Sequence, residues 1–328
     1  MVCWCIAGLM VAILIILYYA VRYFLELIPV KELKKKAVFV TGCDSGFGRE
    51  FVLYCAKNGL HVFAGCLTEK GEESLKEEVK GYQGTVQVMH LDVSNDDSVK
   101  HAKEFVENKL HDGLYLWAVV NNAGILPVYG PSDWSKVEDF KAVLDVNTIG
   151  VIRVTLTFLP LLKQSKGRLV TTTSVLSRVA FPGIAPYQCS KLGTAGFMDT
   201  IREELRWFGI KCCNIEPEIF DTPLIAVPSM QRTIEYSWNR LTAEKRAEYG
   251  EDFKHYCIYK STRIDYVVRN YYHAVTAMFP RTRYYTGWKA LFFYIPLSLL
   301  PTEIHDLIIR LLLHQTAFPV AVESKKQK

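Results

Sequence analysis

The sequence of 328 residues predicts an α/β fold in which helices cover both faces of one doubly wound parallel sheet. Short apolar runs alternate with longer segments of helical periodicity, and a glycine-rich turn directly follows the first of these runs. Further apolar segments flank this region on both sides. We therefore expect a membrane anchor and linker over residues 1–30, a single domain over 31–287, and an apolar segment with a basic tail over 288–328.

The N-terminal segment is predicted to cross a membrane. Residues 2–21 carry no charge, and as a helix they would measure about 30 Å, enough for the hydrocarbon core of a bilayer. The run is too long for a cleaved signal peptide and lacks a basic region before it. Arg22 and four lysines over 31–36 follow it, so the positive-inside rule predicts a cytosolic domain. The ending KKQK at 325–328 resembles a dilysine retrieval signal and predicts the endoplasmic reticulum membrane.

Composition and charge exclude several classes of protein. Half of the residues are hydrophobic and 22% are charged, which excludes intrinsic disorder. The net charge of +5 comes from residues 31–36 and 321–328, so the body is neutral and offers no basic face to nucleic acid. The nine cysteines lack C-x-x-C or metal-like spacing, so we expect no metal site and mostly buried thiols in a reducing compartment.

The alternation predicts seven strands and five helices. The strands are expected at 37–41, 61–66, 86–91, 116–121, 168–173, 211–215 and 283–287. The helices are expected near 46–57, 70–80, 95–110, 136–164 and 188–207.

Two regions depart from this alternation. Residues 221–262 are rich in polar and aromatic side chains, as an insertion over a ligand site would be. The stretches 288–300 and 304–313 are apolar, but the first is short and the second contains charges. We expect them to contact a membrane surface or another subunit, because neither crosses a bilayer comfortably.

The turn after the first strand, TGCDSGFG at 41–48, predicts a dinucleotide site of the Rossmann type. Glycines at a strand-to-helix turn let the backbone bend tightly and approach a pyrophosphate, which then lies on the helix N-terminus. The expected cofactor-binding residues of this turn are Gly42, Asp44, Ser45, Gly46, Phe47 and Gly48.

Two later segments also end strands at the carboxyl edge, where ligands bind in such sheets. Asp92 and Val93 follow the third strand, and the Asp92 carboxylate can accept the adenine amino hydrogens. Asn121, Ala123 and Gly124 end the fourth strand and are expected to face the cofactor.

The residues near the expected adenosine ribose favour NAD over NADP. Binding a 2′-phosphate usually requires Arg or Lys near the glycine turn or after the second strand. Asp44 in the turn would repel a phosphate, and Cys66, Leu67 and Thr68 follow the strand. The carboxylate that would bind the NAD ribose is missing at Cys66, so this preference rests on Asp44 alone.

Tyr187 and Lys191 lie four residues apart and are predicted to share one face of a helix. A phenol is a poor base near neutrality, but an adjacent ammonium and an oxidised nicotinamide both favour the phenolate. Ser174 ends the preceding strand at the same edge, where its hydroxyl can hold a substrate oxygen. Asn147 is expected inside the helix 136–164, where a water-mediated bond to Lys191 would complete a proton path.

Together these motifs resemble the short-chain dehydrogenase/reductase superfamily over roughly residues 37–290. The segments FAGCLTEKG at 63–71, LWAVVNNAGI at 116–125 and FLPLLKQSKGRLV at 158–170 resemble its membrane-associated retinol and hydroxysteroid dehydrogenase branch, which also contains hydroxybutyrate dehydrogenases.

The resemblance assigns a role to each site residue. It implies that Tyr187 donates and accepts the proton, Lys191 binds the nicotinamide ribose, Ser174 positions the substrate and Asn147 supports the proton relay. Thr222 stands where the family binds the nicotinamide carboxamide. A homo-oligomer is also implied.

One position departs from the family pattern. Where the family usually has Pro-Gly after the sixth strand, this chain has Pro217-Glu218. A carboxylate there could crowd the pyrophosphate, or the backbone could need a φ that glutamate tolerates poorly. We therefore expect weakened cofactor binding or a shifted loop.

The sequence thus predicts a membrane-anchored NAD-dependent oxidoreductase that interconverts a lipophilic alcohol, a retinoid or hydroxysteroid, and its carbonyl compound. One alternative is a 3-hydroxybutyrate-type hydroxy-acid dehydrogenase, for which Arg178 is the candidate cation. The other is a catalytically weak nucleotide-binding scaffold, suggested by Glu218.

Overall fold

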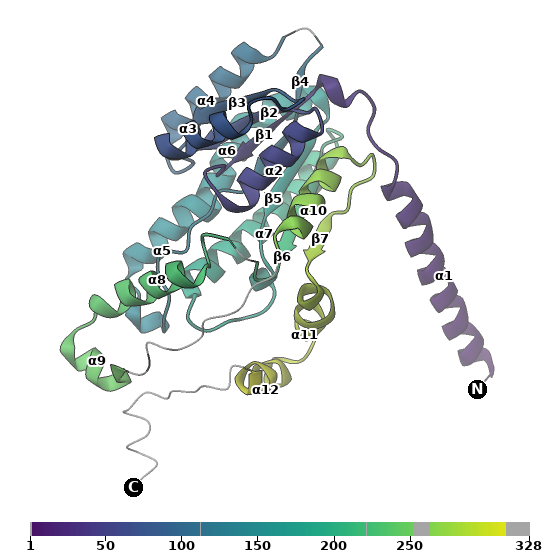
Figure 1. Cartoon of the computed structure of the whole chain (residues 1–328). Coiled ribbons are helices and arrows are strands. Elements are labelled where there is room, and N and C mark those ends of the chain that lie inside the picture. The colour runs from purple at the N-terminus through teal and green to yellow at the C-terminus, as the bar shows by residue number, and fades with distance from the viewer. Residues whose placement is uncertain (1, 112, 221, 252, 254–262, 313–328) are drawn as a thin grey trace.

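A computed structural model describes residues 2–111, 113–220, 222–251, 253 and 263–312. It contains a parallel seven-stranded sheet with the order β3-β2-β1-β4-β5-β6-β7 (Figure 1). The strands are β1 (Lys36–Thr41), β2 (His61–Cys66), β3 (Val86–His90), β4 (Tyr115–Asn121), β5 (Arg168–Thr172), β6 (Lys211–Pro217) and β7 (Arg283–Thr286). All seven predicted strands are confirmed to within two residues.

The inner strands of the sheet are buried on both faces, whereas the edge strands β3 and β7 are only partly buried. Every residue of β1 and of β5 is buried. Phe39 of β1 stacks on Phe158 with 4.2 Å between ring centroids, and both side chains are fully buried. The described cysteines follow the prediction: Cys43, Cys55, Cys66, Cys212 and Cys213 are buried free thiols, and Cys189 is exposed.

Helices cover the sheet in two layers. One core cluster packs α2 (Gly46–Lys57), α3 (Glu69–Glu78) and α10 (Asp265–Thr276) on one face. The other packs α4 (Asp96–Lys109), α6 (Gly150–Ser165) and α7 (Ala185–Arg206) on the opposite face. Because β2 and β3 lie on one side of β1 and β4 on the other, the strand order reverses between β1 and β4. Ligands of such sheets bind at this switch point.

The helix expected over 136–164 runs without a break over Val137–Ser165 and contains one widened turn. It consists of α5 (Val137–Leu144), a π-helical turn at Asp145–Ile149 and α6. The amide of Gly150 donates to the carbonyl of Asp145, the wider spacing of a π-helix. A Cβ on Gly150 would lie 2.9 Å from Val93 Cγ2, so the glycine lets this turn pack against the end of β3. The prediction of a helix over 136–164 is confirmed, and the widened turn is a detail that periodicity does not register.

The insertion at 221–262 is partly helical, with α8 (Val227–Asn239) and α9 (Ala243–Tyr249). Trp238 of α8 packs edge-on against Trp134, and Tyr249 and Phe253 join the same aromatic cluster. Residues 254–262 of the predicted insertion lie outside the described residues.

The N-terminal helix α1 (Val2–Glu26) is long and apolar enough to cross a membrane, and its apolar surface over Ile6–Glu26 is exposed. Its end is tied to the domain: Arg281 forms an ion pair of 2.7 Å with Glu26, and Pro29 bridges to Ala277. The segment predicted as an anchor is therefore a separate helix joined to the domain beside β7, and its crossing of a membrane stays a prediction.

The C-terminal segment folds back onto the domain through helical residues Ala290–Tyr294, α11 (Ile295–Leu297) and α12 (Thr302–Leu312). Leu297 and Ile309 pack around Val179, whereas other apolar side chains of this segment are exposed. Membrane or subunit contact by this surface stays a prediction, and 325–328 lie outside the described residues.

Candidate active site

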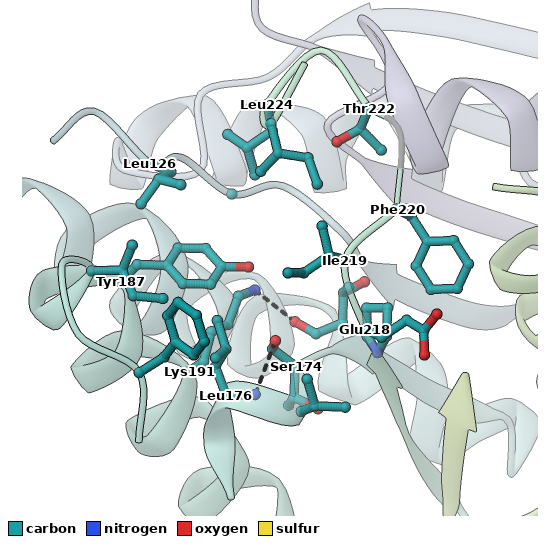
Figure 2. Close-up of a pocket in the computed structure, with 18 of the residues that line it drawn as sticks. Leu126, Ser174, Leu176, Tyr187, Lys191, Glu218, Ile219, Phe220, Thr222 and Leu224 are labelled. Atoms are coloured by element: carbon teal, nitrogen blue, oxygen red, sulfur yellow. Dashed lines mark hydrogen bonds between the residues drawn. The ribbon is translucent and has the colours of Figure 1, made fainter. Parts of the chain in front are cut away.

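The candidate site is a pocket at the carboxyl edge of the sheet, shown in Figure 2. Its lining combines residues from the glycine turn, the ends of β4, β5 and β6, helix α7 and the C-terminal segment. The side chains are mainly apolar, and the Tyr187 hydroxyl points into the interior (Figure 2). Lys191 is the one cation among the described lining residues.

The glycine turn has the geometry that a dinucleotide cofactor requires. Gly42 has a φ of +70°, and a Cβ there would lie 2.7 Å from the Cα of Ala123. A Cβ on Gly48 would lie 2.4 Å from the carbonyl oxygen of Gly42. The turn therefore has room for backbone only, directly before the N-terminus of α2. These residues fit a pyrophosphate bound by backbone amides.

The Asp44 carboxylate lies beside the residues that follow Cys66. It accepts hydrogen bonds from the Leu67 amide at 2.8 Å, the Thr68 amide at 2.9 Å and the Thr68 hydroxyl at 2.7 Å. The carboxylate thus lies at the end of β2, where the ribose of the adenosine half is expected. The nearby Arg49 is paired with Glu78 at 2.6 Å.

The other predicted cofactor residues occupy different settings. Phe47 lines the pocket, Ser45 is exposed at the start of α2, and Val93 is buried. Asp92 accepts bonds from the amide and hydroxyl of Ser94 at the end of β3. Their contacts with a cofactor stay predictions.

Thr222 and Gly124 both border the site. Thr222 is buried, and a Cβ added to Gly46 would lie 3.6 Å from the Cβ of Thr222. Gly124 separates Asn147 from Lys191, because a Cβ there would lie 3.4 Å from Asn147 Oδ1 and 3.8 Å from Lys191 Nζ.

The Asn121 side chain is buried away from the pocket, and a contact of this residue with the cofactor stays a prediction. Its amide donates to the hydroxyls of Thr155 and Thr171, and Asn121 is not among the described residues that line the pocket. Strand residues alternate between faces, so the next residue, Asn122, points to the edge instead. Its amide donates to the carbonyls of Thr41 and Gly42 at 2.9 and 3.0 Å, which ties β4 to the glycine turn.

Tyr187, Lys191 and Ser174 converge on the pocket as predicted. Lys191 Nζ lies 5.5 Å from the Tyr187 ring centroid and donates to the carbonyl oxygen of Thr172 at 2.8 Å. The Ser174 hydroxyl accepts from the Leu176 amide at 3.2 Å, which fixes the serine side chain just beyond β5 (Figure 2). A substrate oxygen placed between Tyr187 and Ser174 would meet two hydroxyl groups.

Asn147 is fully buried in the π-helical turn, and its side chain binds the backbone of the segment after β4. Its Oδ1 accepts from the Ile125 amide at 2.8 Å, and its Nδ2 donates to the Ile125 carbonyl at 3.0 Å and to Ser190 Oγ at 3.1 Å. The widened turn and these bonds account for an asparagine inside a helical segment. The predicted water-mediated bond to Lys191 stays a prediction.

Burial dominates the titration of the two reactive groups. It raises the pKa of Tyr187, the reverse of the expected lowering, and it lowers the pKa of Lys191 to about 8. The expected phenolate therefore depends on positive charge that the bound nicotinamide would add beside Lys191.

The sequence interpretation missed Tyr271 of α10. Its hydroxyl donates to Asn122 Oδ1 at 3.0 Å and shares a hydrogen bond with the Thr172 hydroxyl. Tyr271 therefore connects the turn after β4 with the strand whose carbonyl holds Lys191. No local motif marks this residue, because its role arises from packing between distant segments.

Glu218 does not adopt the strained backbone conformation that the sequence analysis considered. Among the described residues, the non-glycine positions with a positive φ are Glu32 and Lys166, so the φ of Glu218 is not positive. Its carboxylate accepts from the Ala290 amide at 2.7 Å and is directed away from Tyr187 (Figure 2). Of the two possibilities that the sequence raises for Glu218, the strained φ is therefore absent, and weakened cofactor binding or a shifted loop stays a prediction.

Arg178 is engaged elsewhere and does not line the pocket. Its guanidinium forms two hydrogen bonds, of 2.6 and 3.2 Å, with the fully buried carboxylate of Glu216. It is therefore not available as the cation for a hydroxy-acid carboxylate.

Comparisons with known proteins agree with this geometry. The family model of the short chain dehydrogenases matches residues 36–232. The 17-beta-hydroxysteroid dehydrogenase type 6 of Bos taurus is 40% identical over 309 residues, covering 92% of this chain and 96% of the relative. Retinol dehydrogenase 7 of Rattus norvegicus is 38% identical over 304 residues, covering 89% and 93%.

Among solved structures, a short chain dehydrogenase/reductase from Burkholderia phymatum in complex with NAD has a TM-score of 0.67 at 20% identity. The match covers 85% of this chain and 97% of that chain. This likeness shows the fold.

Replacing Lys191 by methionine should stabilise the protein more at pH 7 than at pH 9.5, relative to wild type. With a pKa of about 8 in the folded chain and about 10.4 unfolded, the unfolded chain binds more protons in this window. The free energy of unfolding of the wild type therefore rises by about 2 kcal/mol between pH 7 and pH 9.5. The methionine variant lacks this rise, because methionine does not titrate.

Thermal midpoints in detergent at both pH values check this, with the exposed Lys163→Met as control. A difference between Lys191→Met and wild type that is the same at both pH values would contradict it.

Proposed function

Because the chain belongs to the short-chain dehydrogenase family, in its retinol and hydroxysteroid dehydrogenase branch, we propose that it is an NAD-dependent oxidoreductase of lipophilic alcohols. Its substrate is a retinoid or hydroxysteroid, interconverted with the carbonyl compound. The observation that carries the proposal is the convergence of the Tyr187 and Ser174 side chains in a mainly apolar pocket beside a backbone-only glycine turn.

In the proposed reaction, a bound nicotinamide cofactor would supply the hydride chemistry, taking up the hydride of the alcohol carbon or returning it to the carbonyl carbon. Tyr187 takes the hydroxyl proton during oxidation and donates it during reduction. Ser174 donates a hydrogen bond to the substrate oxygen and so orients the reacting carbon. Lys191, held by the Thr172 carbonyl, binds the nicotinamide ribose and places its charge near Tyr187.

The contacts of Arg178 and Glu218 support the proposal over both alternatives. A hydroxy acid needs a cation for its carboxylate, but Arg178 is bound by Glu216 and Lys191 is beside the catalytic tyrosine. The scaffold hypothesis rested on Glu218 crowding the cofactor, and that carboxylate instead binds the amide of Ala290.

The remaining parts of the proposal concern location and assembly. Helix α1 supports a single-pass membrane anchor, which would keep the domain close to substrates that dissolve in lipid. The basic residues after α1 and the KKQK ending support the endoplasmic reticulum with the domain in the cytosol. A homo-oligomer follows from the family resemblance.

Replacing Tyr187 by phenylalanine is expected to lower kcat/KM about 10²–10⁴-fold, because it removes the general acid/base and little else. NADH formation by detergent-solubilised protein should be measured with retinol, a hydroxysteroid and 3-hydroxybutyrate in turn. NADH binding to the variant, followed by fluorescence, is the control and should be unchanged. Preference for 3-hydroxybutyrate, or full activity of Tyr187→Phe with a lipid alcohol, would refute the proposal.

The wild-type protein is expected to prefer NAD⁺ over NADP⁺, because the Asp44 carboxylate lies at the end of β2 and would repel a 2′-phosphate. In Asp44→Ala the kcat/KM with NAD⁺ divided by that with NADP⁺ should fall about tenfold or more, because one unfavourable charge contact with the 2′-phosphate is lost. Initial rates with each cofactor at a fixed alcohol concentration give the ratio. An NADP⁺ preference in the wild type would show that Arg49 outweighs Asp44.

A further inference from the structure

We propose that Glu218 is a positioning residue that holds residues 288–297, here named the C-terminal wall, over the substrate pocket. This inference rests on the proposed function, which it extends to discrimination among alcohols by size. It concerns the position where the chain departs from its family pattern.

The first step is the attachment of Glu218 to β7. Its backbone amide donates to the Thr286 carbonyl at 3.0 Å, which extends the pairing of β6 with β7 by one residue. Its side chain then lies across Gly287, where a Cβ would come within 2.1 Å of the Glu218 Cδ. Gly287 has a φ of +108°, a conformation that favours glycine. The glutamate side chain thus occupies the space that this glycine leaves.

The second step is the cap on the wall. Glu218 Oε2 accepts from the buried amide of Ala290 at 2.7 Å, in the first turn of the helical segment. A carboxylate at a helix N-terminus satisfies a free amide and interacts favourably with the helix dipole. A glycine at 218 could do neither.

The third step links the wall to the pocket. Tyr294 of the wall lines the same cavity as Tyr187, Ser174 and Glu218. On the outer side of the wall, Trp288 and Phe292 stack on each other and are exposed. The cap therefore decides whether Tyr294 closes the cavity, and an alcohol long enough to reach the wall would sense its position.

The first experiment measures opening of the wall without using activity. Lys289 is exposed within the wall, so trypsin cleavage after it, followed by mass spectrometry on full-length protein, reports local opening. Cleavage should be about tenfold faster in Glu218→Gly, which loses a hydrogen bond to a charged group, and slow in Glu218→Gln, which keeps an acceptor. The exposed Glu104→Gly on α4 controls for glycine substitution. Equal cleavage in wild type and Glu218→Gly would overturn the proposal.

The second experiment separates the wall from the chemistry. Glu218→Gly should raise the KM for a retinoid or steroid alcohol about tenfold, a larger factor than its effect on the kcat/KM for a short allylic alcohol, which does not reach the wall. Tyr294→Ala should raise the KM for the same alcohol by the same factor. The double variant should show no further increase in KM, because both substitutions act through the position of Tyr294. Faster cleavage with unchanged KM would overturn the assignment of the wall to the pocket. If the wild type oxidises no lipid alcohol, the proposed function fails. The cleavage rates still show whether the Glu218 carboxylate holds the wall in place.

Discussion

The contact between the turns that follow β1 and β4 is the constraint on which the site depends. Gly42 and Ala123 approach so closely that no side chain fits on the glycine, and Asn122 fastens the two turns by bonds to two carbonyls. Tyr271 holds Asn122 from α10. Because the strand order reverses here, the two chains leave the edge in opposite directions and open a crevice. The glycine turn and the catalytic pocket share this boundary.

The reactive groups are held by the backbone more than by one another. Lys191 is bonded to the carbonyl of Thr172, Asn147 to both polar groups of Ile125, and Ser174 to the amide of Leu176. Backbone partners at strand ends move little, so the positions of these side chains are set before any ligand binds. The same enclosure withdraws them from water, which shifts the pKa of Lys191 downward and that of Tyr187 upward. Position and reactivity therefore have a common origin.

Local patterns were sufficient for the strands and for the arrangement of Tyr187, Lys191 and Ser174, because each lies at a strand end or on one helix face. They were insufficient where distant segments decide. The widened turn around Asn147 depends on packing of Gly150 against Val93. An NNAG motif does not show which asparagine side chain is directed to the strand edge, and the structure places that of Asn122 there and buries that of Asn121. Glu218 and Tyr271 act on residues about 70 to 150 positions away, which no sequence period reveals.

The strand order has a consequence for synthesis of the chain. Lys36 of β1 pairs with Tyr115 of β4, so the centre of the sheet forms only after two intervening strands and their helices have left the ribosome. The apolar floor of the pocket is complete by residue 230, yet Tyr294 covers it only when the last tenth of the chain emerges. During that interval the nascent domain exposes the apolar lining of its pocket to solvent, and aggregation is then the main hazard that chaperones would prevent.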